Sequence, residues 1–100
     1  MNSIPVCMRD VTVGLEHGLH LTPSSQIVQT AQRFQAKISI RKGELVVDGK
    51  SMLDLLSLAA AHGEVLRLET QGADAPQALQ ALVALFEQNF ASEPPPTETR

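Results

Sequence analysis

The sequence has no tryptophan and no tyrosine, and three phenylalanines are its only Phe, Trp or Tyr residues. Its formal net charge is −3, because eight Lys and Arg stand against eleven Asp and Glu. Proteins that bind nucleic acid usually carry a basic excess, and many stack bases on aromatic side chains. The sole adjacent basic pair is Arg41-Lys42. We therefore expect no nucleic-acid partner.

Cysteine is also scarce. Cys7 is the only one, so a disulfide within the chain and a cysteine-rich metal site are excluded. His17 and His20 have the spacing of a possible metal-ligand pair, but no third ligand lies at a suitable spacing, and zinc sites need three or four ligands. We expect no metal and no other cofactor.

Long apolar runs are missing as well. No stretch approaches the ~18 apolar residues that cross a bilayer. The first eight residues lack the basic and apolar regions of a signal peptide. We therefore expect a cytoplasmic protein that does not associate with a membrane.

The length of 100 residues suits one domain, and a chain of this size has little room for a deep substrate cavity. The apolar fraction of 43% is ordinary for a globular protein. Residues 91–100 combine three prolines with polar neighbours, a composition that favours disorder. The sequence thus predicts a domain at residues 1–90 and a disordered tail at 91–100.

Alternation of apolar and polar residues predicts four short strands. These strands cover residues 11–13, 37–41, 45–47 and 65–70. Apolar residues at helical spacing predict three helices, with N-caps at Thr22, Ser51 and Asp74. The order β-α-β-β-α-β-α with short links predicts an α+β fold. We expect an open two-layer sandwich, in which a four-stranded antiparallel sheet carries three helices on one face.

The first and last helices have clear apolar faces. In the first, Pro23 follows Thr22 and occupies the first helical position, where its missing N–H is not needed. The apolar residues that follow are Ile27, Val28, Ala31 and Phe34. The buried face of the last helix is predicted to contain Leu79, Leu82, Val83, Phe86 and Phe90.

The second helix is predicted to begin at Ser51, because Ser51 and Asp54 have the spacing of a capping box. Its apolar stripe is predicted at Met52, Leu55, Leu56 and Ala59, with Gly63 as the C-terminal glycine.

Some apolar side chains of this second helix are candidates for a docking surface. If Leu55 and Ala59 face the sheet, Leu53 and part of Leu56 remain exposed near His20. An exposed apolar patch often marks a docking site. The alternative is that these two leucines, together with Met52, complete the core.

His20 is the candidate for chemistry, because it directly precedes the first helix. The first N–H groups of a helix have no intrahelical partners, and the helix dipole is positive there. A histidine in this place can carry a phosphoryl group whose oxygens accept from backbone N–H groups. From the local pattern alone, the alternative is a surface histidine with no function.

Residues 18–25, GLHLTPSS, resemble the active-site segment of the HPr phosphocarriers. The order of residues in that segment is Gly, then Leu or Ile, then His, any residue, Arg, Pro and Ala. Residues 49–53, 56–58 and 72–74 fall where this family places its regulatory serine, its second helix and the start of its third helix. The similarity extends over about residues 11–90, and the predicted order of elements is that of the family.

The resemblance implies that enzyme I phosphorylates His20 with a phosphoryl group from phosphoenolpyruvate, and that sugar-specific IIA domains receive it. It adds that Ser51 is the target of a dedicated serine kinase in some members. Such a protein is a phosphohistidine relay of the phosphotransferase system rather than an independent enzyme. We expect it to act as a monomer.

Thr22 departs from the family pattern, which has arginine at this position. The arginine steadies the charge of the transferring phosphoryl group, whereas threonine brings no positive charge. Two functions therefore remain open: a phosphocarrier, or an HPr-like regulatory binding module with impaired phosphotransfer. An independent enzyme is less favoured, because His20 has no acid–base partners and no cavity.

Overall fold

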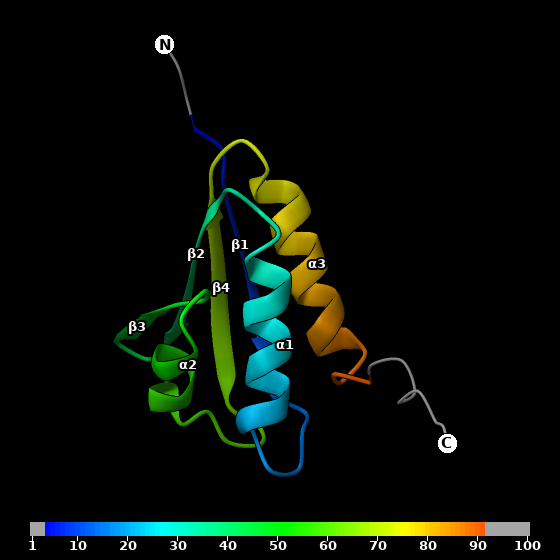
Figure 1. Cartoon of the computed structure of the whole chain (residues 1–100). Helices are drawn as coiled ribbons and strands as arrows, with labels where there is room; N and C mark the ends of the chain where they lie inside the picture. The colour runs from blue at the N-terminus through cyan, green and yellow to red at the C-terminus, as the bar shows by residue number, and fades with distance from the viewer. Residues whose placement is uncertain (1–3, 92–100) are drawn as a thin grey trace, which may run out of the picture.

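The computed structural model describes residues 4–91, and their elements follow the predicted order (Figure 1). The strands are β1 (Val6–Thr12), β2 (Lys37–Lys42), β3 (Leu45–Asp48) and β4 (Val65–Gln71). The helices are α1 (Leu21–Ala31), α2 (Met52–Leu58) and α3 (Ala75–Glu87). The predicted tail lies, except for Ala91, outside the described residues.

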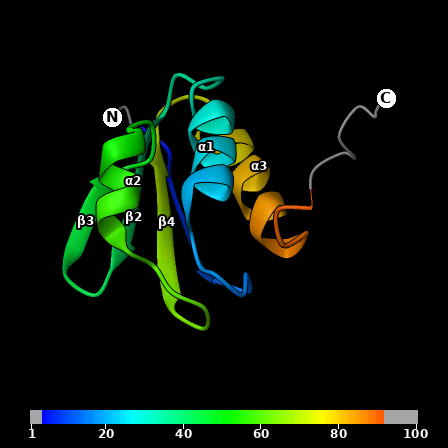
Figure 2. The same ribbon diagram turned by 60° about the horizontal axis from the view of Figure 1, so that its bottom comes forward.

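The strands form one antiparallel sheet in the order β1-β4-β2-β3. All three helices cover the same face of this sheet, and α1 lies between α2 and α3 (Figures 1 and 2). The predicted α+β open sandwich is confirmed. No helix within residues 4–91 has the length and apolar character that a bilayer crossing requires.

The core lies between the sheet and the helices. Because side chains alternate along a strand, Ile38 and Ile40 of β2 point toward the helices and are buried. Leu66 and Leu68 of β4 are buried beside them. The apolar face of α3 closes this layer, and the rings of Phe86 and Phe90 meet edge to face at 4.8 Å between centroids. Burial of these side chains is the main source of stability.

Strand β1 and helix α2 both differ from the predicted boundaries. Strand β1 begins five residues earlier than the predicted start at Val11. Helix α2 ends at Leu58, and Ala59 (φ 50°) takes the left-handed position that was predicted for Gly63. The buried residues of α2 are therefore Leu55 and Leu58, while Ala59 is exposed. The predicted stripe is wrong at Ala59, because the helix is too short to carry it.

Asp74 precedes α3 as predicted, but its side chain does not bond to its own helix. The two carboxylate oxygens accept instead from the backbone N–H groups of Gln35 (2.9 Å) and Ala36 (2.8 Å). Asp74 thereby fastens the connection between α1 and β2 to the start of α3. Its role is a tertiary contact rather than a local cap.

Candidate functional site

His20 is the N-cap residue of α1, and its side chain is exposed. Its backbone is extended (φ −80°, ψ −162°), and its carbonyl accepts the first helical hydrogen bond from the N–H of Ser24 at 3.1 Å. The N–H groups of Leu21 and Thr22 lie in the first turn, where a helix offers no acceptor for them. His20 therefore stands at the positive end of α1, next to two backbone donors.

Thr22 is not the N-cap, contrary to the prediction. Because His20 takes that place, Thr22 is the second helical residue and Pro23 the third. Proline is tolerated there, since the third N–H of a helix also lacks an intrahelical acceptor. The buried Ser24 stabilises this early start, because its hydroxyl donates to the carbonyl of Leu19 at 3.1 Å.

The turn before His20 is fixed by backbone contacts. The N–H of Gly18 donates to the carbonyl of Leu15 at 3.0 Å, which closes the turn, and the N–H of the buried Leu19 donates to the carbonyl of Ala60 at 2.9 Å. Gly18 has φ +71°, and a Cβ atom there would lie 2.4 Å from the Ala60 oxygen. Glycine is needed both for the left-handed backbone and for this close approach.

Ala60 belongs to the connection between α2 and β4, which two charged side chains organise. Oε1 of Glu64 accepts from the N–H of Ala61 at 2.7 Å and from Nζ of Lys42 at 3.4 Å. Nζ of Lys42 also donates to the carbonyl of Ala59 at 3.2 Å. The Ala61 N–H, and after it the Lys42 charge, hold the pKa of Glu64 below its ordinary value of 4.5. This network supports the carbonyl to which Leu19 is bonded.

Replacing Glu64 by glutamine should lower the melting temperature at neutral pH. A carboxyl group with a lowered folded-state pKa stabilises the fold above its ordinary pKa, and this contribution is lost as the pH falls through the lowered value. Wild type and Glu64→Gln should therefore converge in acid. Melting followed by circular dichroism checks this, with Glu44→Gln at an exposed site as control. A difference that stays equal at all pH values would contradict the role of the charge.

Ser51 is the N-cap residue of α2, as predicted, and its hydroxyl oxygen accepts from the N–H of Asp54 at 3.2 Å. The carboxylate of Asp54 does not return to Ser51 but accepts from the N–H of Asp48 at 3.0 Å. Only one half of the predicted capping box is therefore formed. Ser51 lies at the end of α2 opposite to Ala60, and so away from the contact between Ala60 and the turn before His20.

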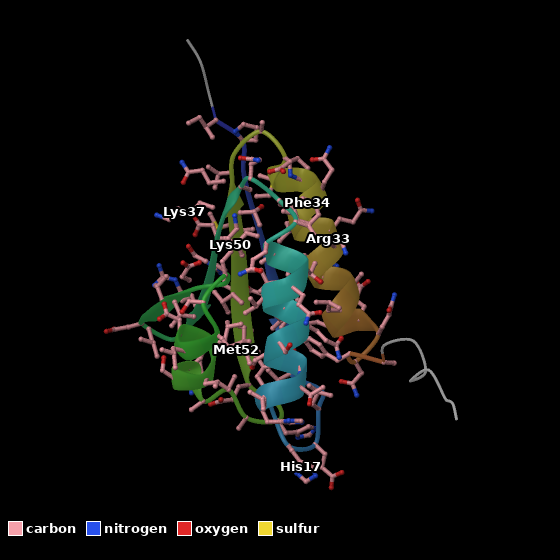
Figure 3. All side chains as sticks on the ribbon, viewed as in Figure 1. His17, Arg33, Phe34, Lys37, Lys50 and Met52 are labelled. Atoms are coloured by element: carbon pink, nitrogen blue, oxygen red, sulfur yellow. The ribbon has the colours of Figure 1, made fainter. Side chains whose placement is uncertain are left out.

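The apolar side chains proposed for docking lie on α2. Leu53 is 80% exposed and Leu56 is 38% exposed, whereas Met52 is half-buried and lies between α2 and α1 in the view of Figure 3. Leu53 is therefore not a core residue. Leu21, which was not among the predicted docking residues, is 63% exposed in the first turn of α1. Its signal was an apolar residue outside the buried stripe of that helix.

Leu21, Met52, Leu53 and Leu56 are called the α1–α2 apolar surface below. The two helices that carry them lie side by side on the sheet (Figures 1 and 2). Exposed apolar side chains grouped on neighbouring elements often belong to a contact surface for another protein. His20 directly precedes one of these helices, so the surface adjoins the candidate phosphorylation site.

His17 is exposed at the turn before His20, and the centroids of the two rings lie 6.4 Å apart at an angle of 69°. The pair stands without further ligands: among the described residues, no group of three His, Cys, Asp or Glu side chains is arranged to hold a metal ion. Neither histidine is buried. Both rings are therefore open to solvent and to a partner protein.

Comparison with known proteins agrees with this geometry. The family model described as the PTS HPr component phosphorylation site matches residues 7–88. The phosphocarrier protein HPr of Neisseria meningitidis serogroup A is 42% identical over 73 residues, which are 73% of this chain and 82% of the relative. The HPr-like protein Crh of Halalkalibacterium halodurans is 39% identical over 79 residues, which are 79% of this chain and 94% of the relative.

A solved structure shows the same arrangement of strands and helices. The crystal structure of HPr-C-His from Thermoanaerobacter tengcongensis superposes with a TM-score of 0.83 and 33% identity, over 88% of this chain and 99% of that one. The matched family model extends from β1 to the end of α3 and includes His20. The chain therefore belongs to the HPr family of phosphocarrier proteins of the phosphotransferase system.

Proposed function

We propose that the protein accepts a phosphoryl group from phosphorylated enzyme I on His20 and passes it to IIA domains. In the first step a ring nitrogen of His20 attacks phosphorus with its lone pair, and the bond between phosphorus and the donor breaks with its electron pair left on the donor. In the second step a nucleophile of the IIA domain attacks, and the P–N electron pair returns to His20. Neither step is a redox reaction.

The observation that carries this proposal is the exposed position of His20 as the N-cap of α1 in a chain of the HPr family. The backbone N–H groups of Leu21 and Thr22 are placed to donate to phosphoryl oxygens. Such fixed donors stabilise the negative charge that spreads over these oxygens during transfer. The exposed ring allows another protein's active site to reach it, and we place this relay in the cytoplasm.

The α1–α2 apolar surface is the docking site in this proposal. Leu53 and Leu56 expose apolar area that a partner would bury, and Met52 contributes the part of its side chain that α1 does not cover. Burial of apolar area favours association by about 25 cal/mol per Å² before the costs of binding are subtracted. Enzyme I and IIA domains would use the same surface in turn, with the chain acting as a monomer.

We also propose Ser51 as the target of a serine kinase. Its hydroxyl oxygen is engaged with the N–H of Asp54, and the residue is half-buried at the start of α2. A phosphate there would bring about two negative charges close to Met52 and Leu53. This added charge would change which partner the docking surface accepts.

A regulatory binding module with impaired phosphotransfer is the second candidate function. The specific observation in its favour is Thr22, an exposed neutral side chain in the first turn of α1 beside His20. The similarity to the HPr-like protein Crh fits either function. Incubation with phosphoenolpyruvate and enzyme I separates the two, because a phosphocarrier takes up one acid-labile phosphate and passes it on to a IIA domain.

Thr22→Arg tests whether a cation at this position speeds phosphoryl transfer. A guanidinium donates to two phosphate oxygens at once, so transfer to a conventional IIA domain should become ~10-fold faster, which corresponds to about 1.4 kcal/mol. The measurement is the rate of phosphoryl loss from His20 to the acceptor at fixed ionic strength. Gln29→Arg adds the same charge to α1 two turns away and should leave the rate unchanged.

The native acceptor decides between the two functions. If Thr22→Arg speeds transfer to every acceptor, Thr22 impairs phosphotransfer and the regulatory function is favoured. If the variant slows transfer to the native acceptor alone, the site is adapted to a partner that supplies its own cation, and the phosphocarrier function is favoured. An unchanged rate with all acceptors would show that this position does not contribute to transfer.

A further inference from the structure

We propose that His17 is a second functional histidine, whose imidazolium donates a hydrogen bond to the phosphoryl group on His20 and supplies its positive counter-charge. The inference rests on the proposed phosphorylation of His20. His17 would not carry the phosphoryl group. It would hold the group in place and stabilise its negative charge, a contribution made through contact with the transferred atoms.

The turn at residues 15–18 fixes where His17 stands. Its ends are tied by the bond from the N–H of Gly18 to the carbonyl of Leu15, at 3.0 Å, and by the bond from Leu19 to Ala60. The half-buried Leu15 packs against the core. His17 therefore projects from a defined backbone, below the N-terminal end of α1 in Figure 3. A fixed backbone lowers the entropy lost when its side chain binds an anion.

The distance between the two rings suits a group held between them. Their centroids are 6.4 Å apart at 69°, so the rings are not stacked face to face. A phosphoryl group on the His20 nitrogen that faces His17 occupies the space between the rings. A charge-assisted N–H···O hydrogen bond needs about 2.7–2.9 Å between nitrogen and oxygen. The His17 ring can turn about its side-chain bonds to reach this distance.

Backbone donors at the site are fewer than a helix start usually offers. Leu21 and Thr22 each present an N–H in the first turn, but Pro23, the next residue, has none. A phosphoryl group has three oxygens to be bound, and each accepts more than one hydrogen bond. The phosphoryl oxygens can therefore accept a further hydrogen bond from a donor outside the helix.

Three of the described cations are neutralised in ion pairs elsewhere. In each pair, nitrogen and oxygen lie 3.4 Å apart or less. The pairs are Arg9 with Glu87, Lys42 with Glu64, and Arg67 with Asp10.

The remaining cations of residues 4–91 lie in other parts of the fold. Nζ of Lys50 donates to the carbonyl of Phe34 at 2.8 Å, and Arg33 lies over the ring of Phe34. Arg33, Lys37 and Lys50 lie toward the other end of α1 from His17 (Figure 3). Arg41 is exposed on β2, opposite Arg67 on the face of the sheet that the helices do not cover.

Within the turn, Glu16 is exposed and negative, so His17 is the side chain of residues 15–18 that attracts a phosphoryl group. A negative charge within about 4–6 Å favours the protonated form of an imidazole. The phosphoryl group on His20 would thus itself favour the imidazolium form of His17, with the proton supplied by solvent. No bond to His17 forms, and the phosphorus keeps its single bond to His20.

The test compares His17→Gln, His17→Lys and His62→Gln. The glutamine variant removes the charge, lysine restores it, and His62 is an exposed histidine in the turn before β4 that serves as control. The measurement is the first-order rate of phosphoryl transfer from His20 to a saturating IIA acceptor. We expect His17→Gln to be about fivefold slower, as for loss of one charge-assisted contact, and His17→Lys and His62→Gln to stay within about twofold of wild type.

A transfer rate of His17→Gln equal to that of wild type would overturn the proposal. Equal losses of transfer rate in His17→Gln and His17→Lys would also overturn it, because they would indicate a structural role. Failure of enzyme I to label His20 would instead overturn the proposed function. Loading His20 with phosphoramidate then tests His17 alone. The phosphorus NMR resonance of phosphorylated His20 should move in His17→Gln and not in His62→Gln, and an unmoved resonance contradicts the contact.

Discussion

Replacing His20 by alanine should abolish the acid-labile phosphate that, in the proposed function, the chain acquires from phosphoenolpyruvate and enzyme I. The imidazole nitrogen of His20 is the nucleophile in this proposal, and removal of a nucleophile lowers a transfer rate by roughly a thousandfold or more. The side chain is exposed, so the free energy of unfolding of the variant should lie within about 0.5 kcal/mol of that of wild type. Intact-mass measurement counts the phosphate, and circular dichroism checks the fold.

The other two histidines provide matched controls for this experiment. His17→Ala and His62→Ala should still acquire one phosphate, because neither residue precedes a helix as an N-cap. If the His17 inference holds, His17→Ala passes the phosphate on more slowly but retains the site. A phosphate that remains in His20→Ala would show that another residue is the acceptor and would remove the basis of the proposed function.

Gly18→Ala should destabilise the protein by about 2–4 kcal/mol, because it combines two unfavourable effects. The left-handed backbone at φ +71° strains any residue with a Cβ, and this Cβ would lie 2.4 Å from the carbonyl oxygen of Ala60. Relief of the clash must push the turn away from Ala60 and break the hydrogen bond from Leu19. The variant should therefore also transfer phosphate more slowly, since His20 follows directly.

Gly43→Ala separates the two effects. Gly43 has a similar φ of +61°, but a Cβ there meets no atom within 4 Å. This variant should lose only about 1 kcal/mol from backbone strain. Urea unfolding of both variants gives the comparison. Equal losses of unfolding free energy would mean that the turn before His20 moves at no energetic cost. The contact between Gly18 and Ala60 would then not fix the position of His20.

The order of the elements was accessible from the sequence because most strands and helices bury one regular face. Strand β1 is the exception. Arg9 occupies a position on the helix side of the strand, between Cys7 and Val11, yet it is exposed and lies 3.4 Å from Glu87 of α3. A charge at an inward position at the edge of the sheet breaks the alternation. The first half of β1 therefore could not be recognised from its pattern.

Helix boundaries were harder to predict because tertiary contacts decide them. Thr22 and Pro23 have the residue types of a helix start, but the bond from Leu19 to Ala60 sets the backbone so that the helix begins at Leu21. Ala59 ends α2 with a left-handed backbone, although glycine is the usual residue there. Its carbonyl accepts from Lys42, a residue 17 positions away. Local preferences contain no information about such partners.

At the candidate site, the residue for chemistry could be predicted from the sequence, but the residues that hold its backbone in place could not. His20 was predicted from its place before a helix and from the family resemblance of residues 18–25, so both of these signals lie within eight residues of sequence. The residues that hold it in place, Ala60, Lys42 and Glu64, come from two distant segments. Nothing in their own sequence context indicates that they act on the turn before His20, so only the folded chain reveals them.

The pairing of the first strand with the last has a consequence for synthesis on the ribosome. Among the described strands, β1 pairs with β4 alone, from Val6 with Gln71 to Thr12 with Val65, so a nascent chain leaves its first strand without this partner until β4 has been made. Such long-range pairing is slow to form. The anchor of the His20 turn, Ala60, also emerges late. In the proposed function, the chain can therefore present His20 to enzyme I in the described geometry only after β4 has been made and has paired with β1.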